Sequence, residues 1–160
     1  MEILNFIDKE LVFPMLQVKS RDELFAFMSG ELNKKGYVKE SYLEGLKKRE
    51  KIFPTGLQLS DYGCALPHTE IKHVIKPAIS IATLKESVSF GNMESPNSKI
   101  KVNVIFMLAL NKSEHQLEAL KQLVTLFQNQ KVMNKIMKAK NNHELLNIIS
   151  SYEDLLLSAK

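Results

Sequence analysis

The four histidines of this 160-residue sequence are the side chains best suited to reversible chemistry near neutral pH. They are His68, His73, His115 and His143. An unperturbed imidazole has a pKa of about 6.5, so much of it is neutral and nucleophilic at pH 7. The predicted elements around each histidine therefore decide which of them can form a site.

His68 directly follows a run of small and apolar residues, Gly63 to Leu66, and then Pro67. This pattern predicts a short strand ended by the proline, which lacks an N–H and fixes its own φ. In open α/β sheets, ligands bind beyond the C-terminal ends of strands. We interpret His68 as an imidazole held at such an end, although its position alone fits a surface-loop histidine equally well.

His115 lies at a second strand-to-helix junction. The segment Lys101 to Leu110 is apolar on both alternating faces and predicts a central strand. Ser113 and Gln116 then have the spacing of a capping box, which places His115 in the first turn of a helix. Free N–H groups and the helix dipole favour an anion there and a neutral imidazole, which can donate to a phosphoryl oxygen. Without His68, an exposed first-turn residue would be the preferred interpretation.

Arg49 falls on an apolar face of a helix predicted over Lys39 to Ile52. Tyr42, Leu46 and Phe53 share that face at helical spacing. An unpaired guanidinium is costly to bury. Arg49 either extends to solvent at the helix end or reaches a site, where its fork of donors holds a phosphoryl group.

The remaining chemical candidates carry weaker signals. His73 together with His68 and His115 suggests zinc, but the spacing matches no ligand motif, and we expect no metal. His143 is predicted to face solvent, and Cys64 to pack as a small hydrophobe. Phosphate-binding glycine loops, a nucleophile elbow and a dinucleotide fingerprint are absent from the sequence, so no cofactor is expected.

The pattern of the remaining segments predicts an α/β fold: a single layered domain over residues 1–160, with a mixed sheet and helices on both faces. No repeat or flexible linker divides the chain. The gap between Leu66 and Ile79 need not contain a crossover helix, which favours the mixed sheet. The other predicted elements in the first half are a strand at Leu11–Phe13 stopped by Pro14, and a helix capped by Ser20–Glu23 and ended by Gly36. A further strand is predicted from Ile79, followed by C-terminal helices. The first of these helices carries a buried stripe formed by Leu117, Leu120, Val124 and Phe127.

Composition excludes several classes of protein. The chain is 44% hydrophobic and 25% charged, as soluble globular proteins are. Its net charge of +4 comes from scattered lysines and arginines, so we expect no nucleic-acid partner. No apolar run approaches the ~20 residues of a spanning helix. The N-terminal residues do not read as a signal peptide, and there is one cysteine, so a cytoplasmic location is expected.

Two segments carry a family resemblance. Arg49-Glu50-Lys51-Ile52-Phe53-Pro54-Thr55-Gly56, followed by Gly63-Cys64-Ala65-Leu66-Pro67-His68-Thr69, resembles the enzyme IIA family of the bacterial phosphoenolpyruvate-dependent sugar phosphotransferase system, in its fructose/mannitol superfamily. The likeness extends from about Ser20 to Ile149. The segment Phe53 to Leu57 is most similar to the galactitol-type branch. The same is true of the position of His73, five residues after His68.

The resemblance implies a sheet of about five strands and a phosphotransferase with a phosphohistidine intermediate. His68 would accept a phosphoryl group from the histidine-containing phosphocarrier protein and pass it to an enzyme IIB, for uptake of a galactitol-like sugar. Arg49 and His115 would support the transfer. No cofactor or metal is implied, and the membrane permease would be only an indirect partner.

Two other functions are compatible with the same residues. A regulatory enzyme IIA receives a phosphoryl group but controls other proteins. A small-molecule or metal-binding module would use the histidines differently. The identity of the sugar is not encoded in an enzyme IIA, because this component touches other proteins and never the sugar.

Overall fold

A five-stranded mixed sheet forms the centre of the computed structural model, which describes residues 2–158. The strand order is β1-β4-β5-β3-β2. β1 is parallel to β4 and β3 is parallel to β5, whereas the pairs β4·β5 and β2·β3 are antiparallel. The predicted mixed sheet is confirmed. The strands are β1 (Ile7–Leu16), β2 (Gly56–Gln58), β3 (Gly63–Ala65), β4 (Ala78–Gly91) and β5 (Lys99–Ala109).

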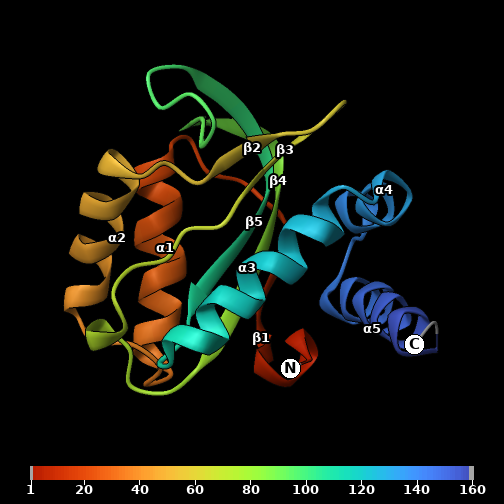
Figure 1. The fold of residues 1–160 in the computed structure, drawn as a ribbon, viewed down its shortest axis with the longest axis horizontal. Helices are drawn as coiled ribbons and strands as arrows, with labels where there is room; N and C mark the ends of the chain where they lie inside the picture. Colours follow the sequence, from red (N-terminus) through yellow and green to blue (C-terminus); the bar gives the residue numbers. More distant parts are fainter. Residues whose placement is uncertain (1, 159–160) are drawn as a thin grey trace.

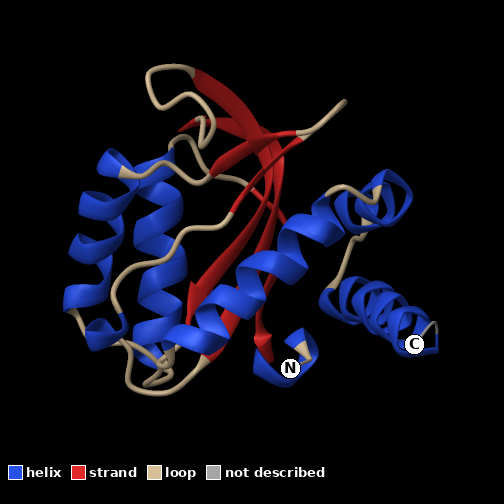
Figure 2. Ribbon diagram, in the orientation of Figure 1, coloured by secondary structure: helices blue, strands red, loops and turns tan. Residues whose placement is uncertain are grey.

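Helices cover both faces of this sheet, as predicted (Figures 1 and 2). α1 and α2 lie on one face, and α3, α4 and α5 lie on the other. No helix within residues 2–158 is both long and apolar enough to cross a membrane. The helices are η1 (Ile3–Phe6), α1 (Arg21–Lys34), α2 (Ser41–Ile52), η2 (Ile71–His73), α3 (Ser113–Phe127), α4 (Gln130–Lys138) and α5 (Asn142–Ser158), with η denoting a 3-10 helix.

β5 divides the hydrophobic core into two layers. Phe106 and Leu108 point to the layer beneath α3, α4 and α5, whereas Ile105 and Met107 point to the layer beneath α1 and α2. All four side chains are buried. The strand is therefore covered on both faces, as its continuous apolar pattern predicts.

The first strand is longer than its sequence pattern predicts. Pro14 was expected to end a strand at Leu11–Phe13, but β1 continues to Leu16. β1 is an edge strand, where a missing N–H breaks no ladder on the open side. The next residue, Met15, has a φ of 57°, and its N–H donates to Thr83 Oγ1 at 2.8 Å. A side-chain acceptor thus replaces the regular pairing after the proline.

The predicted helix start at Ser20 is confirmed. Ser20 Oγ accepts a hydrogen bond from the Glu23 N–H at 3.1 Å, and Glu23 Oε2 accepts one from the Lys19 N–H at 3.2 Å. These bonds satisfy free N–H groups at the first turn of α1. The predicted stop is also confirmed, because α1 ends just before Gly36, which has a φ of 78°.

The second predicted capping box is wrong. α3 begins at Ser113, as expected, but its N-cap residue is Lys112 and no side chain caps it. Gln116 Oε1 is instead buried with no hydrogen-bond partner in the structure described. The first turn of α3 is therefore fixed by packing, not by a local side-chain cap.

Helix α2 is tied to the sheet at the edge where β3 and β5 end. Tyr42 is fully buried, and its hydroxyl donates to the Leu108 carbonyl at 2.7 Å. The Leu108 N–H in turn donates to the Pro67 carbonyl at 2.9 Å. These two bonds connect α2, β5 and the segment after β3, which are the parts that carry the candidate side chains.

Replacing Tyr42 by phenylalanine tests this connection. The Tyr42→Phe variant loses one buried hydrogen bond and keeps the ring, so we expect the free energy of unfolding to fall by about 1–2 kcal/mol. Urea denaturation measures the change. Tyr37→Phe is the matched control, because the Tyr37 hydroxyl donates to Asp8 Oδ2 in a partly exposed pair. Equal losses from the two variants would contradict a special role for the Tyr42 contact.

Candidate functional site

His68 is held by a hydrogen bond to its own strand end. The side chain follows β3 and is only 7% exposed. Its Nδ1 lies 2.6 Å from the Leu66 carbonyl oxygen. A carbonyl oxygen can only accept, so Nδ1 carries the proton and donates it. The neutral ring therefore keeps a free lone pair on Nε2.

The surroundings of His68 favour this neutral form. Burial lowers the pKa of His68, because a charged imidazolium loses its hydration there. The positive charge of Arg49 lowers this pKa further, against the opposing effect of the bond to the Leu66 carbonyl. The neutral form of His68 is thus favoured at pH 7, and its unprotonated Nε2 is a nitrogen base.

A pocket of about 610 Å³ opens beside His68. Two of its apolar residues, Phe53 and Met93, are themselves exposed, so the pocket has an apolar rim. In Figure 1 the segment after β3 passes between α2 and α3, whose residues form the walls of the pocket. The pocket is lined by Arg49, Phe53, Pro54, Thr55, Leu66, His68, Met93, Leu120, Lys121, Val124 and Thr125.

Arg49 shares this pocket with His68. It lies in the last turn of α2, and its guanidinium carbon is 5.0 Å from the centre of the Phe53 ring. Its Nε is buried with no hydrogen-bond partner among the residues described. The structure places Arg49 in the pocket that His68 lines, and its role in holding a phosphoryl group stays a prediction. Stacking on Phe53 orients the planar group over an apolar face.

The structure does not bring His115 into the same pocket. His115 is in the first turn of α3, and its ring lies 5.7 Å from that of Phe6, between ring centres. α3 faces the pocket through residues one to three turns further along, from Leu120 to Thr125. The strand β5 does end at the same sheet edge as β3, as expected. The helix after it, however, points its first turn towards η1.

Only part of the stripe predicted for α3 is buried, because Phe127 lies in the core and the other three residues are more exposed. Leu117 is 56% exposed, and Leu120 and Val124 are only half-buried. The residues of α3 that enter the core are Ala119, Leu123, Leu126 and Phe127. Leu120 and Val124 pack against the core on one side and line the pocket on the other, so part of the stripe is also the wall of the site.

The sequence interpretation missed Glu50, Thr55 and Lys121. Glu50 is 2% exposed, and both of its carboxylate oxygens accept from Thr55: Oε2 from the N–H at 2.6 Å and Oε1 from the hydroxyl at 2.8 Å. The sequence did contain a signal for Glu50 and Thr55, because Arg49-Glu50 is followed by the Pro-Thr-Gly turn in the segment that carries the family resemblance. Lys121 had no such signal, because one lysine on an exposed helix face is not distinctive.

His73 lies in a neighbouring cavity of about 400 Å³ that also reaches Arg49. Its Nδ1 is 2.7 Å from Ser41 Oγ. Among residues 2–158, no three His, Cys, Asp or Glu side chains gather as a metal site would require.

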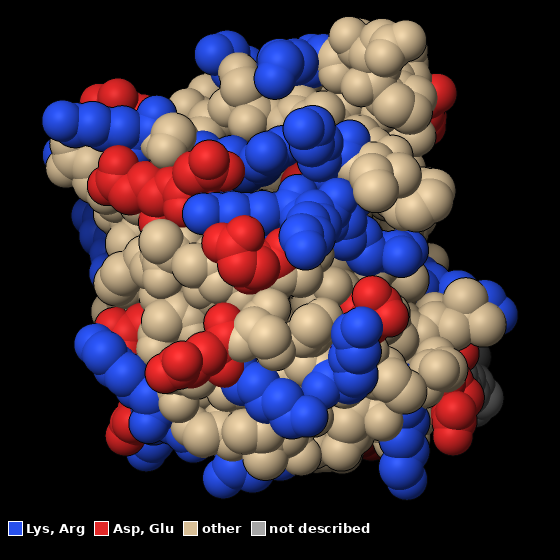
Figure 3. Space-filling model, turned by 90° about the vertical axis from the view of Figure 1, so that its left-hand side faces the viewer, with Lys and Arg blue, Asp and Glu red and all other residues tan. Residues whose placement is uncertain are grey.

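Figure 3 views the side of the molecule that carries α2, where basic and acidic side chains are interspersed.

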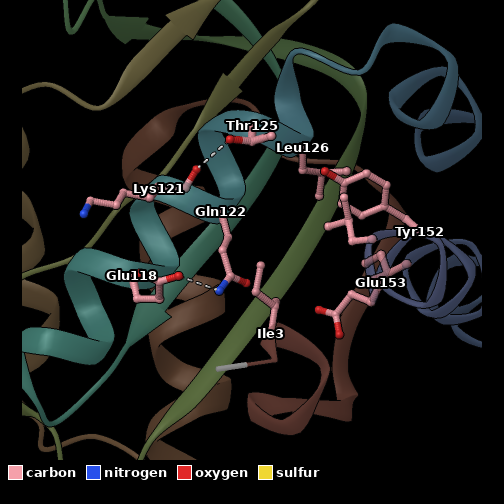
Figure 4. Close-up of a pocket in the computed structure, with 10 residues that line it drawn as sticks. Ile3, Glu118, Lys121, Gln122, Thr125, Leu126, Tyr152 and Glu153 are labelled. Carbon is pink, nitrogen blue, oxygen red and sulfur yellow. Dashed lines mark hydrogen bonds between the residues drawn. The ribbon is translucent and has the colours of Figure 1, made fainter. Parts of the chain in front are cut away.

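A third cavity, of about 260 Å³, lies between η1, α3 and α5 (Figure 4). Its lining includes Ile3, Tyr152 and Glu153 but neither His68 nor Arg49. The Glu153 carboxylate accepts from the Leu4 N–H at 3.1 Å, so it joins α5 to η1. This contact serves the packing of the two ends of the chain.

Two curated proteins illustrate the sequence similarity. The chain is 35% identical over 109 residues to the transcriptional regulator ManR of Bacillus subtilis. The matched region covers 68% of this chain and 15% of the regulator. The chain is 29% identical over 103 residues to the galactitol-specific EIIA component of Escherichia coli K12. The matched region covers 64% of this chain and 68% of that component. The chain thus matches only a small part of the longer regulator.

Solved structures share the fold over nearly the whole chain. A putative PTS IIA, PtxA, of Streptococcus mutans has a TM-score of 0.77 at 22% identity and covers 96% of each chain. The Escherichia coli complex of enzyme IIA mannitol with phosphorylated enzyme IIB has a TM-score of 0.73 at 21% identity, covering 91% of this chain and 97% of that one.

The family model described as "phosphoenolpyruvate-dependent sugar phosphotransferase system, EIIA 2" matches residues 5–152. With the mixed sheet and a histidine seated at the end of β3, this chain belongs to the enzyme IIA family of the phosphoenolpyruvate-dependent sugar phosphotransferase system.

Proposed function

We propose that this chain relays a phosphoryl group through Nε2 of His68. The observation that carries the proposal is the bond from Nδ1 to the Leu66 carbonyl, which leaves Nε2 unprotonated in a pocket beside Arg49. In the forward step, Nε2 forms a bond to phosphorus while the nitrogen–phosphorus bond of a donor phosphohistidine breaks. The donor nitrogen takes the electron pair of the broken bond, and the proton stays on His68 Nδ1, hydrogen-bonded to the Leu66 carbonyl.

Arg49 is proposed to balance charge on the transferring group. Phosphoryl transfer has a loose transition state with charge spread over three oxygens, so a positioned cation accelerates it. Lys121 brings a second cation to the α3 side of the pocket. His115 remains a proposed supporting residue on the resemblance alone, because its ring lies against Phe6 and outside the pocket lining.

The proposed donor is the histidine-containing phosphocarrier protein and the proposed acceptor is an enzyme IIB. A related fold has been solved as a complex with phosphorylated enzyme IIB, which supports an acceptor of that kind. The burial of His68 supports protein partners, because a donor must present its phosphohistidine inside the apolar rim. Similarity to a galactitol-specific EIIA component supports the galactitol branch for the transport system served.

A regulatory role is the second candidate, favoured by the similarity to the regulator ManR. The two roles share the chemistry at His68 and differ in the next step. In transport, a cognate enzyme IIB becomes phosphorylated; in regulation, the phosphorylated chain acts on another protein. Transfer to a panel of enzyme IIB proteins separates the two.

Labelling tests the proposed acceptor residue. Incubation with phosphoenolpyruvate, enzyme I and the phosphocarrier protein is expected to give an acid-labile phosphoryl adduct on the wild-type chain. His68→Ala removes the nucleophile, so no adduct should form, as measured by mass spectrometry at neutral pH. His143→Ala is the control, because His143 is exposed on α5 and should leave labelling intact. An adduct on the His68→Ala variant would refute the assignment.

The positions of Arg49 and His115 predict unequal contributions to the transfer. Arg49→Gln removes the cation from the pocket, so single-turnover transfer from the phosphocarrier protein should slow by ~10²-fold. His115→Gln should slow it clearly less, because the ring lies outside the pocket lining. Rapid-quench kinetics measures both rates. A loss from His115→Gln as large as that from Arg49→Gln would contradict this ranking.

The lowered pKa of His68 predicts the pH dependence of phosphoryl acceptance. The neutral ring is the proposed nucleophile, so the rate should decline as the pH falls, with a midpoint below the ordinary imidazole value of about 6.5. NMR titration of the His68 ring gives the pKa directly. Arg49→Gln removes one of the causes that lower this pKa, so the midpoint should rise. An unchanged midpoint in that variant would show that the Arg49 charge does not act on His68.

A further inference from the structure

A chain of hydrogen bonds runs from a buried carboxylate to the nucleophile. Glu50 accepts two bonds from Thr55, through the N–H and the hydroxyl. Thr55 Oγ1 in turn accepts from the Leu66 N–H at 3.3 Å. The Leu66 carbonyl then accepts from His68 Nδ1 at 2.6 Å. Each link joins the next residue directly, and Glu50, Thr55, Leu66 and His68 are all buried.

The Thr55 hydroxyl occupies a position that belongs to the β-sheet ladder. β2 and β3 pair antiparallel, with Gly56 opposite Ala65, so the next pair along would be Thr55 opposite Leu66. β2 begins only at Gly56, and at this point the side chain of Thr55 accepts the Leu66 N–H. The end of β3 is thus held by a side chain whose own orientation depends on Glu50.

Glu50 fixes which way the Thr55 hydroxyl points. A carboxylate only accepts, so the hydroxyl proton is directed to Glu50 Oε1 and a lone pair is left for the Leu66 N–H. The bond to Thr55 holds the backbone of Leu66 at its N–H, and the Leu66 carbonyl, in the next peptide group, accepts the hydrogen bond from His68 Nδ1. Burial raises the pKa of Glu50, while its bonds from Thr55 and the charges of Arg21 and Arg49 oppose that rise.

We propose that Glu50 is a positioning residue for phosphoryl transfer: acting through Thr55 and the backbone of Leu66, it holds His68 in the tautomer that presents Nε2 to the pocket. Glu50 does not itself line the pocket; it reaches the site only through its two bonds with Thr55, which does. Its effect is on the direction of the Leu66 carbonyl, and hence on which ring nitrogen carries the proton. The inference rests on the proposed function for its consequence in catalysis, but the tautomer itself is a property of the unphosphorylated chain.

The experiment compares three variants of the full chain with one control. Thr55→Val removes the hydroxyl at nearly constant volume and leaves the Leu66 N–H without its acceptor. Thr55→Ser retains the hydroxyl and should rescue. Glu50→Gln replaces the carboxylate by an amide whose NH₂ group cannot accept from Thr55. Glu153→Gln is the control, because Glu153 is also buried and accepts from a backbone N–H, but it lies on α5.

Two readouts separate positioning from stability alone. Long-range ¹H–¹⁵N NMR of the imidazole nitrogens, recorded above the pKa of His68, reports the tautomer. Single-turnover kinetics reports transfer from the phosphocarrier protein. We expect the wild-type chain and Thr55→Ser to hold the Nδ1–H tautomer. Thr55→Val and Glu50→Gln should give a mixture, with transfer slowed about tenfold, the lower end of what outer hydrogen-bond partners contribute.

The control defines the outcome that overturns the inference. Glu153→Gln should lower stability without changing the tautomer or the rate. If Glu50→Gln behaves in the same way, Glu50 is structural and the proposal is wrong. If the wild-type chain accepts no phosphoryl group, the proposed function fails, yet the tautomer measurement still tests the hydrogen-bond chain. If Thr55→Val does not fold, Glu50→Gln and Thr55→Ser still decide between the two roles.

Discussion

The hydrogen bond from His68 Nδ1 to the Leu66 carbonyl is the constraint on which the chemistry of the site depends. It commits the proton to one ring nitrogen and leaves the lone pair on the other. The bond requires a carbonyl that does not move, and the sheet supplies it. β3 is paired on both sides, by β5 and β2, and the Pro67 carbonyl is tied to the Leu108 N–H. β3 has only three residues, but its pairing with β5 and β2 holds it in place.

The residues whose position follows from local signals could be predicted from the sequence. A small apolar run ended by Pro67 gives the seat of His68, and helical spacing places Arg49 on the face shared with Tyr42 and Leu46. His115 could be assigned to the first turn of a helix, which is also local. Its surroundings could not, because the rotation of α3 is set by which of its residues pack into the core beneath it.

Long-range partners account for the other differences between pattern and structure. Pro14 stops a strand only where both sides of the strand are paired, and the alternation of residues does not say that β1 lies at an edge. Leu120 and Val124 have the spacing of a core stripe, but the same spacing serves a pocket wall. The contact between Glu50 and Thr55 spans a turn, so no local pattern predicts it. The only indication in the sequence was the family-like segment that begins at Arg49.

Burial of the nucleophile links its reactivity to its partners. Burial of His68 favours the neutral ring, and it would shield the proposed phosphoryl group from hydrolysis. In the proposed relay, a donor or acceptor group carried on another protein would reach Nε2 past the apolar rim at Phe53 and Met93. A relay of this kind must also release its cargo. In the proposed mechanism the stacked guanidinium of Arg49 would stabilise the transferring charge without enclosing it, and this suits a carrier better than a tight phosphate cradle would.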